Sequence, residues 1–373
     1  MKREILNLMY RARAFEPVRL ANSGKALVLH YHRFSLEPQP AATLASVFEA
    51  QLAYLTRHYE IVPLRVIAGC LARRAPLPRR ALAITVDDGY RDFYEVAHPI
   101  LQKFKASATI FIVADFVDRK CWIWTDKVRY LLRNAADSGR TVDLNTIVDL
   151  DVLSRGGLDG LHSVPSGLAG ERATGAAGTS CLKHEGDIAS AADRINSGLK
   201  SMPESQRDYA INILASRMGV SLPPDPPDEY AAVSWDQLRE LSSCSVEVGS
   251  HSMTHPILIR ESNERVRYEV NESKSKIERL TGCPVNMFCY PNGDYEKRTV
   301  LEARRARYLG AVTCRDGLNS HRESQYELRR VHTVDEFARF LQRTSGLEQM
   351  KQAIRQRGRT SARGIKRRYE TAE

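Results

Sequence analysis

The chain has 373 residues, of which 43% are hydrophobic and 27% are charged, and its formal net charge is +10. This composition fits a globular protein with a large core and argues against wholesale disorder. No apolar run reaches the roughly 20 residues of a membrane-spanning helix, and Arg11, Arg13 and Glu16 interrupt the apolar region that a signal peptide needs.

Strand-like and helix-like segments alternate in the first third of the chain. Short apolar runs predict strands at 26–31, 59–62, 81–86 and 108–113. Apolar residues at helical spacing predict helices at 44–58 and 93–104. This alternation predicts parallel strands that are covered by helices.

The alternation stops between about Asp115 and Tyr230. Seven glycines lie between Gly156 and Gly178, which is too many for a packed element, whereas 188–214 has a helical pattern. We therefore expect a helical, partly flexible insertion over 116–229 rather than a second enzyme.

The strand and helix rhythm returns after Tyr230. Helices are predicted at 235–241, 265–280 and 297–308, and strands at 246–250, 285–290 and 311–313. Six or seven such units indicate an α/β fold, a distorted or incomplete (β/α) barrel of about seven strands, with chemistry at the carboxyl ends of the strands. The expected domains are a 1–25 N-terminal extension, a barrel from 26–115 and 230–340, the 116–229 insertion and a basic tail at 341–373.

The tail carries most of the charge imbalance. From Lys351 to Tyr369 there are eight Lys or Arg residues and no acidic one. Such a run could contact an anionic membrane or an acidic glycan, but we favour a solvated tail. Nucleic acid is not an expected partner because no nucleic-acid motif accompanies the charge. We expect a cytoplasmic protein and leave peripheral attachment to a membrane open.

Two adjacent carboxylates end the third predicted strand, at Asp87 and Asp88, and Gly89 follows them. Each carboxylate opposes ionisation of the other, and a metal bound by one of them would relieve that repulsion and leave the other as a base. Alone, Asp-Asp-Gly is a common turn.

Two histidines follow the strand at 246–250, at His251 and His255. Four residues apart on one helical turn, they would face the same way and suit a divalent ion, although exposed histidines at a helix start would give the same pattern. Together with one carboxylate they form a facial triad with open positions for water and substrate. The strand predicted at 285–290 runs into the turn Tyr290-Pro291-Asn292-Gly293. This turn could aim a backbone N–H at an oxyanion, or it could be an ordinary Asn-Gly turn.

These residues resemble the polysaccharide deacetylase family, also known as the NodB-homology or chitooligosaccharide deacetylase domain and as carbohydrate esterase family 4. The segments that carry the likeness are His30-Tyr31-His32-Arg33, Thr85-Val86-Asp87-Asp88-Gly89 and His251-Ser252-Met253-Thr254-His255, in the family's order. The Tyr-Pro-Asn-Gly turn and the insertion look like members associated with bacterial exopolysaccharide synthesis.

The resemblance implies a role for each matched residue. Asp87 would be the general base, and Asp88, His251 and His255 would hold the metal. Asn292 would offer its backbone N–H to the oxyanion.

Three positions depart from the family's pattern, and the first, Val86 in place of the usual Phe within a buried strand, should not alter the chemistry. Cys289 stands where the family has an Arg that pairs with the base, and Arg330 could reach in from the last strand instead. The late histidine that serves as general acid has no clean match; His332 is our candidate, with His321 behind it.

The resemblance implies a metal-dependent hydrolase that removes acetyl groups from a carbohydrate by cleaving carbon–nitrogen amide bonds. Zinc is the default metal for two histidines and a carboxylate, and iron, manganese or cobalt would fit the same ligands. Two alternatives stay open: an esterase or amidase on another acylated substrate, and a catalytically impaired carbohydrate-binding protein.

Overall fold

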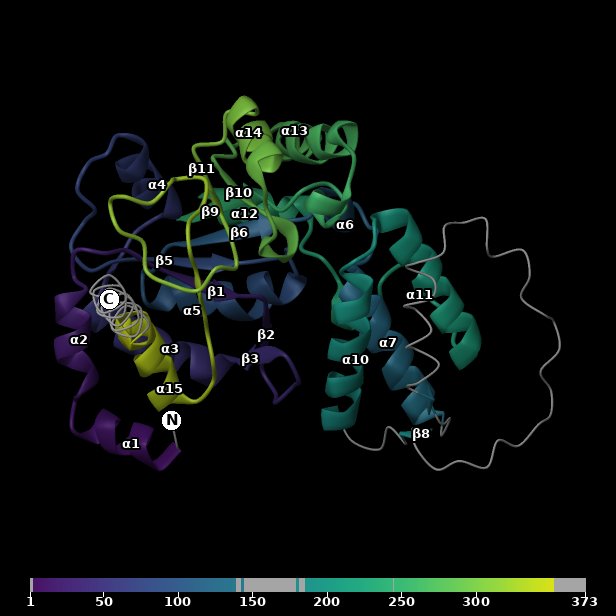
Figure 1. Ribbon diagram of the computed structural model, residues 1–373, viewed down its shortest axis with the longest axis horizontal. Coiled ribbons are helices and arrows are strands. Elements are labelled where there is room, and N and C mark those ends of the chain that lie inside the picture. Colours follow the sequence, from purple (N-terminus) through teal and green to yellow (C-terminus); the bar gives the residue numbers. More distant parts are fainter. Residues whose placement is uncertain (1–2, 139–141, 144–178, 181–184, 244, 352–373) are drawn as a thin grey trace, which may run out of the picture.

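The computed structural model describes residues 3–138, 142–143, 179–180, 185–243 and 245–351. A curved sheet crosses the middle of the molecule, with helices packed around it (Figure 1). The sheet consists of β1 (Leu27–Tyr31), β4 (Glu60–Ile61), β5 (Ala81–Val86), β6 (Ala108–Ile112), β9 (Val246–Ser250), β10 (Met287–Cys289), β11 (Gly310–Val312) and β12 (Val331–His332).

All pairings within this sheet are parallel, and its order is β11-β10-β9-β6-β5-β1-β12, with β4 beside β5. The two ends of the sheet approach each other, because Val312 of β11 forms a parallel bridge with Leu328, just before β12. The sheet is therefore curled into a distorted (β/α) barrel, which confirms the expected fold class.

The strands are continuous apolar runs because both of their faces are covered. Every residue of β1, β5, β6 and β9 is buried, as is usual for parallel strands packed between layers. The covering helices are α3 (Ala45–His58), α4 (Leu64–Ala72), α5 (His98–Lys103), α6 (Ala114–Val117), α12 (Trp235–Ser243), α13 (Asn263–Thr281), α14 (Lys297–Arg305) and α15 (Phe337–Thr344).

One helix that was expected in this layer is divided into two elements. The segment predicted as a single helix over 93–104 begins as a π-helical turn, η1 (Phe93–Ala97), and continues as α5. Beside it, β2 (Arg33–Ser35) and β3 (Ala42–Leu44) form a separate two-stranded parallel sheet.

A group of three helices stands beside the barrel, at the right of Figure 1, and has a core of its own. It comprises α7 (Trp124–Asp137), α10 (Glu185–Leu199) and α11 (Glu204–Met218). The expected single helical stretch over 188–214 is thus two helices, and Pro203 at the N-cap of α11 marks the break. The pair β7 (Val142–Asp143) and β8 (Thr179–Ser180) is antiparallel. The glycine-rich part of the insertion lies outside the described residues.

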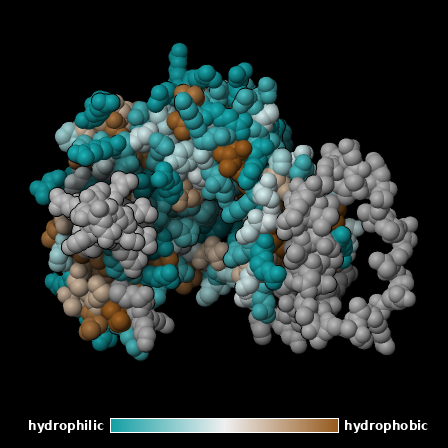
Figure 2. Space-filling model, viewed as in Figure 1, coloured by the Kyte–Doolittle hydropathy of each residue, from teal (hydrophilic) through white to brown (hydrophobic). Residues whose placement is uncertain are grey.

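The N-terminal segment forms α1 (Arg3–Arg11) and α2 (Phe15–Ala21), which lie near α15 (Figure 1). Ile5 and Leu8 of α1 are exposed, on a molecule whose visible surface is mostly hydrophilic (Figure 2). Within the part of the chain that the structure describes, no helix is long and apolar enough to cross a membrane.

Candidate active site

Five strands deliver polar side chains to one end of the barrel. Each of these residues lies within one residue of the end of its strand: His30 (β1), Asp87 (β5), His251 (β9), Cys289 (β10) and His332 (β12). Because the strands are parallel, their carboxyl ends meet at the same face of the barrel, where (β/α) enzymes place their chemistry.

The turn after β5 separates the two carboxylates. Asp88 and Gly89 both adopt a left-handed backbone, with φ of 74° and 81°. A Cβ atom on Gly89 would lie 2.9 Å from Ile112 Cγ2, so only glycine fits this position without a shift. The turn leaves Asp87 facing Arg330, which directly precedes β12, and Asp88 facing the segment after β9.

Asp88, His251 and His255 bring three donor atoms together. Asp88 Oδ1 lies 3.5 Å from His251 Nε2 and 3.6 Å from His255 Nε2. All three residues are buried, and their ligand atoms lie within 4.8 Å of one another. This is the set of donors that the sequence assigned to a metal.

The two histidines do not lie on a helical turn, and this expectation was wrong. Ser252 and His255 have positive φ values of 72° and 63°, so the chain runs through an irregular turn. The Ser252 hydroxyl accepts a hydrogen bond from the His255 N–H at 3.0 Å, and the buried Glu269 carboxylate accepts two more from the backbone N–H groups of Met253 and Thr254. These bonds, rather than helical periodicity, hold the two imidazoles on one side.

Electrostatics around Asp88 favour a cation. Burial, followed by the charge of Asp87, raises the pKa of Asp88 well above its ordinary value. Burial also lowers the pKa values of His251 and His255. Two unprotonated imidazoles therefore face Asp88, where the charges of Arg33 and Arg129 do not outweigh burial, and a divalent ion would supply further positive charge.

His251 is already oriented as a ligand. Its Nδ1 lies 2.8 Å from the backbone carbonyl of Cys289. When Nδ1 carries the proton and donates to this carbonyl, the Nε2 lone pair faces Asp88, which is the usual arrangement for a metal-bound histidine. The residues present therefore fit a bound divalent metal.

Asp87 has different partners. Arg330 donates two hydrogen bonds to it, from Nη1 to Oδ1 at 2.7 Å and from Nη2 to Oδ2 at 2.8 Å. Thr85 and the Thr313 carbonyl accept further bonds from the same guanidinium, which is 1% exposed. Burial alone raises the pKa of Asp87, but Arg330 and then His30 outweigh burial and bring the pKa well below its ordinary value.

Cys289 occupies the space between these groups. Its Sγ lies 3.4 Å from Asp87 Oδ2 and accepts a hydrogen bond from Arg330 Nη2 at 3.3 Å. Burial raises the pKa of the Cys289 thiol well above its usual range. A neutral thiol thus stands where a guanidinium was expected from the family's pattern, and Arg330, directly before β12, supplies the positive charge.

Replacing Arg330 with Met should raise the pKa of Asp87, because burial would then act without its main opponent. The acid limb of kcat/KM against pH should move to higher pH, and unfolding should become easier by about 3–5 kcal/mol, the usual cost of leaving a buried charge unpaired. Arg330→Lys is the matched control, since it keeps the charge and loses the two-point contact. An unmoved acid limb in Arg330→Met would show that the guanidinium does not set the ionisation of Asp87.

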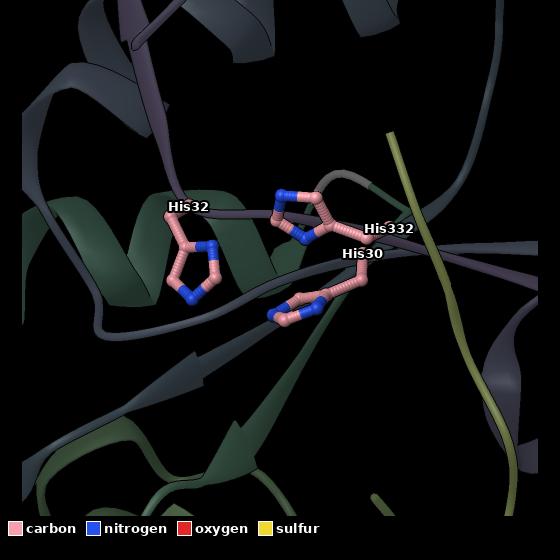
Figure 3. A group of neighbouring side chains, drawn as sticks. All are labelled: His30, His32 and His332. Atoms are coloured by element: carbon pink, nitrogen blue, oxygen red, sulfur yellow. The ribbon is translucent and has the colours of Figure 1, made fainter. Parts of the chain in front are cut away.

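Three imidazoles gather near Asp87, and Figure 3 shows them together. They belong to His30, His32 and His332, and His30 Nε2 lies 2.9 Å from Asp87 Oδ2. His32 and His332 line the same pocket as Asp87, whereas His321 is exposed on a turn and does not line it. The sequence patterns assigned no role to His32. The spacing His30-x-His32 on extended chain indicates that both side chains project from the same face.

Asn292 also lines the pocket, from the 3-10 turn η5 (Pro291–Gly293). Its φ of 59° and the φ of 77° at Gly293 make this a tight left-handed turn. A Cβ atom on Gly293 would lie 2.4 Å from the backbone nitrogen of Cys314, so the turn packs closely against the segment after β11.

The pocket has a volume of about 430 Å³ and lies between the barrel and the three-helix insertion. Asp87, Asp88, His251 and His255 form its floor. The insertion contributes one wall, with Trp124 and Arg129 from α7 and with Asp193, Asn196, Ser197 and Lys200 from α10. Polar side chains dominate this wall, which suits a hydroxyl-rich ligand.

Comparisons with known proteins point to one family. The polysaccharide deacetylase family model matches residues 74–152 and 216–311. YxkH of Bacillus subtilis (strain 168), a protein named after polysaccharide deacetylases, is 24% identical over 136 residues, which is 36% of this chain and 47% of that protein. The chain thus matches about half the length of this curated relative.

Two solved structures share the fold. The deacetylase PplD of Streptococcus pyogenes, solved in complex with acetate, aligns with a TM-score of 0.52 at 17% identity, over 86% of this chain and 98% of that one. IcaB from Ammonifex degensii aligns with a TM-score of 0.50 at 17% identity, over 86% and 97%.

Proposed function

The chain carries a polysaccharide deacetylase domain and belongs to that family, whose members hydrolyse N-acetyl amide bonds, and we propose that it is a metal-dependent deacetylase of an acetylated carbohydrate. The observation that carries the proposal is the division of labour between two adjacent carboxylates. Asp88 faces two imidazoles, while Asp87 faces Arg330. One carboxylate is thus disposed to bind a cation and the other to accept a proton.

Asp88, His251 and His255 would hold the metal, with zinc the first candidate. A bound divalent ion lowers the pKa of a water and polarises a carbonyl. Asp87, kept ionised by Arg330, removes the proton of the attacking water. The Asn292 backbone N–H stabilises the oxyanion.

The leaving amine needs a proton, because an amine anion is a very poor leaving group. His332 is the proposed donor; it lines the pocket, and His32 stands beside it with ring centroids 6.0 Å apart. Both imidazoles line the same pocket as the proposed metal ligands.

His332→Gln should lose about a hundredfold or more of turnover on an N-acetyl substrate, the usual contribution of general acid catalysis. It should lose far less on an activated acetyl ester, whose leaving group needs no proton. His32→Gln is the matched comparison. If His32→Gln shows the amide-selective loss and His332→Gln does not, the proton donor is His32.

Acetate release from a panel of acetylated oligosaccharides, with and without chelator, tests the proposed function. We expect release from N-acetylated members that stops with chelator and returns with added zinc. Release from non-carbohydrate acyl compounds alone would favour an esterase or amidase. Binding of the oligosaccharides without any release would favour an impaired carbohydrate-binding protein. For the biological setting, we propose the synthesis or modification of a bacterial polysaccharide.

The part of the basic tail beyond Lys351 is proposed to be a solvated segment, and residues 352–373 lie outside the described part. The first residues of the expected tail, 341–351, include the end of α15 and pack against the barrel. Leu347 is buried and Lys351 pairs with Glu348, so the fold extends to about Lys351. Truncation after Lys351 should leave turnover on a short neutral oligosaccharide unchanged. It should weaken any binding to anionic vesicles in a salt-dependent way. A large loss of turnover would place the tail within the fold or the site.

A further inference from the structure

A second cluster of side chains that could bind a metal lies next to Asp87, which also neighbours the proposed metal ligands. It consists of His30, His32 and His332, and the proposed chemistry uses only one of them, as a proton donor. One nitrogen from each ring lies within 4.8 Å of the others.

The backbone places these three rings together. His30 and His32 are two residues apart on extended chain, so they project from the same face. β12 pairs with β1 in parallel, and His332 is directly opposite His30. Neighbouring residues in register on one sheet face have adjacent side chains, and the ring centroids are 4.3 Å apart for His30 and His32 and 5.2 Å apart for His30 and His332.

The geometry is close to that of a coordinated ion. Zinc binds imidazole nitrogen at about 2.0–2.1 Å, which puts two tetrahedral ligand atoms about 3.4 Å apart. Starting from separations of at most 4.8 Å, each nitrogen would move by less than about 1 Å to reach that spacing. Rotation of the half-buried His32 and the exposed His332 can supply this movement.

The buried ring of the cluster lies against a carboxylate. His30 is 5% exposed, and its Nε2 lies 2.9 Å from Asp87 Oδ2. The ionised carboxylate would attract a cation that binds next to this ring. Figure 3 shows the three rings turned toward a shared space.

We propose that His30, His32 and His332 form a second divalent-cation site, suited to zinc or a similar borderline metal, and that its occupation inhibits deacetylation. Three imidazoles without a carboxylate favour such metals over magnesium or calcium. The site contributes no negative charge of its own, so its ion should bind more weakly than the ion at Asp88.

The inhibitory part of this proposal rests on the proposed function. An ion here takes the nitrogen lone pairs of His332 and prevents it from carrying the proton to the leaving amine. It also places a positive charge next to Asp87, which weakens the carboxylate as a base. Deacetylation should therefore need one ion and be inhibited by a second.

The test is zinc binding by metal-free full-length protein, measured by equilibrium dialysis and elemental analysis. Wild type should bind one equivalent tightly and a second more weakly. His32→Gln and His332→Gln should each keep the tight step and weaken the second step by more than about tenfold. Loss of a metal ligand costs at least as much zinc affinity as loss of a residue that only contacts a ligand. His321→Gln, in an exposed turn, should bind like wild type, and His251→Ala should lose the tight step only.

Activity is followed in wild type during the same titration. Acetate release should rise through the first equivalent and fall at the free zinc concentration at which the second binds. A second step that persists in both His32→Gln and His332→Gln would overturn the site, and undiminished release with the second step saturated would overturn inhibition. Two bound equivalents in a protein that releases no acetate would support the second site and count against the deacetylase.

Discussion

Asp87→Asn should keep its metal and its substrate affinity and lose turnover by about a hundred- to ten-thousandfold, the usual contribution of a general base. The amide has the shape of the carboxylate but cannot accept the proton of the attacking water. All three proposed ligands stay in place, because Arg330 holds Asp87, whose Oδ2 lies 4.0 Å from His251 Nε2, farther than Asp88 Oδ1 at 3.5 Å. The measurements are kcat and KM for acetate release, together with the metal content of the purified variant.

The wild-type pH profile gives a second view of the same residue. The pKa of Asp87 lies well below its ordinary value, since Arg330 and His30 outweigh burial. The base therefore stays ionised as the pH falls through the usual carboxylate range of about 4, and its protonation should reduce the rate only in stronger acid.

Metal loss from Asp87→Asn, with tight metal binding retained by Asp88→Asn, would mean that the two roles are reversed. Wild-type acetate release from both variants would remove this site from catalysis.

Much of the barrel could be predicted because its strands have a simple signature. Strands covered on both faces, such as β5 and β9, are unbroken apolar runs. Each run stops where polar residues begin, so the strand ends could be located to within a residue or two. Parallel strands share one carboxyl end, and the convergence of Asp87, Asp88 and His251 could be inferred without coordinates.

The details of the turns could not be predicted in this way. A four-residue spacing between His251 and His255 fits a helical turn, but positive φ angles and the buried Glu269 produce the same grouping in irregular chain. The pairing of Arg330 with Asp87 connects residues that are 243 positions apart. Only the order of strands in the sheet brings β12 beside β1, and no local pattern specifies that order.

The histidine cluster shows the same limit. His30 and His32 could be assigned to one face from their alternation, but His332 joins them only through the register of β12 against β1. The wall formed by α7 and α10 was also beyond sequence reasoning, because helical periodicity predicts an apolar face and not the partner of the polar face.

Asp88→Asn should have opposite effects on stability with and without metal. The pKa of Asp88 is raised in the folded protein by burial and by Asp87. A carboxyl whose pKa is raised in the folded state does not destabilise the fold at pH values below its unfolded pKa of about 3.9. It carries its full penalty in folding free energy at pH values above its folded pKa. At neutral pH with chelator, the Asn variant escapes this penalty, so its Tm should equal or exceed that of wild type.

Added zinc should reverse that order. An ion that binds only the folded state stabilises wild type by about 2.7 kcal/mol when its free concentration is a hundred times Kd. The variant keeps two imidazoles but lacks the charged ligand, so its gain should be smaller, and its activity should recover only at high zinc. Thermal unfolding of both proteins with chelator and with zinc measures the crossing.

An Asn variant that is less stable than wild type in chelator, yet gains as much from zinc, would show that Asp88 serves the fold and not the metal. A crossing at neutral pH that disappears below about pH 4 would identify ionisation of Asp88 as its cause, because a protonated Asp88 neither carries the penalty nor holds the ion.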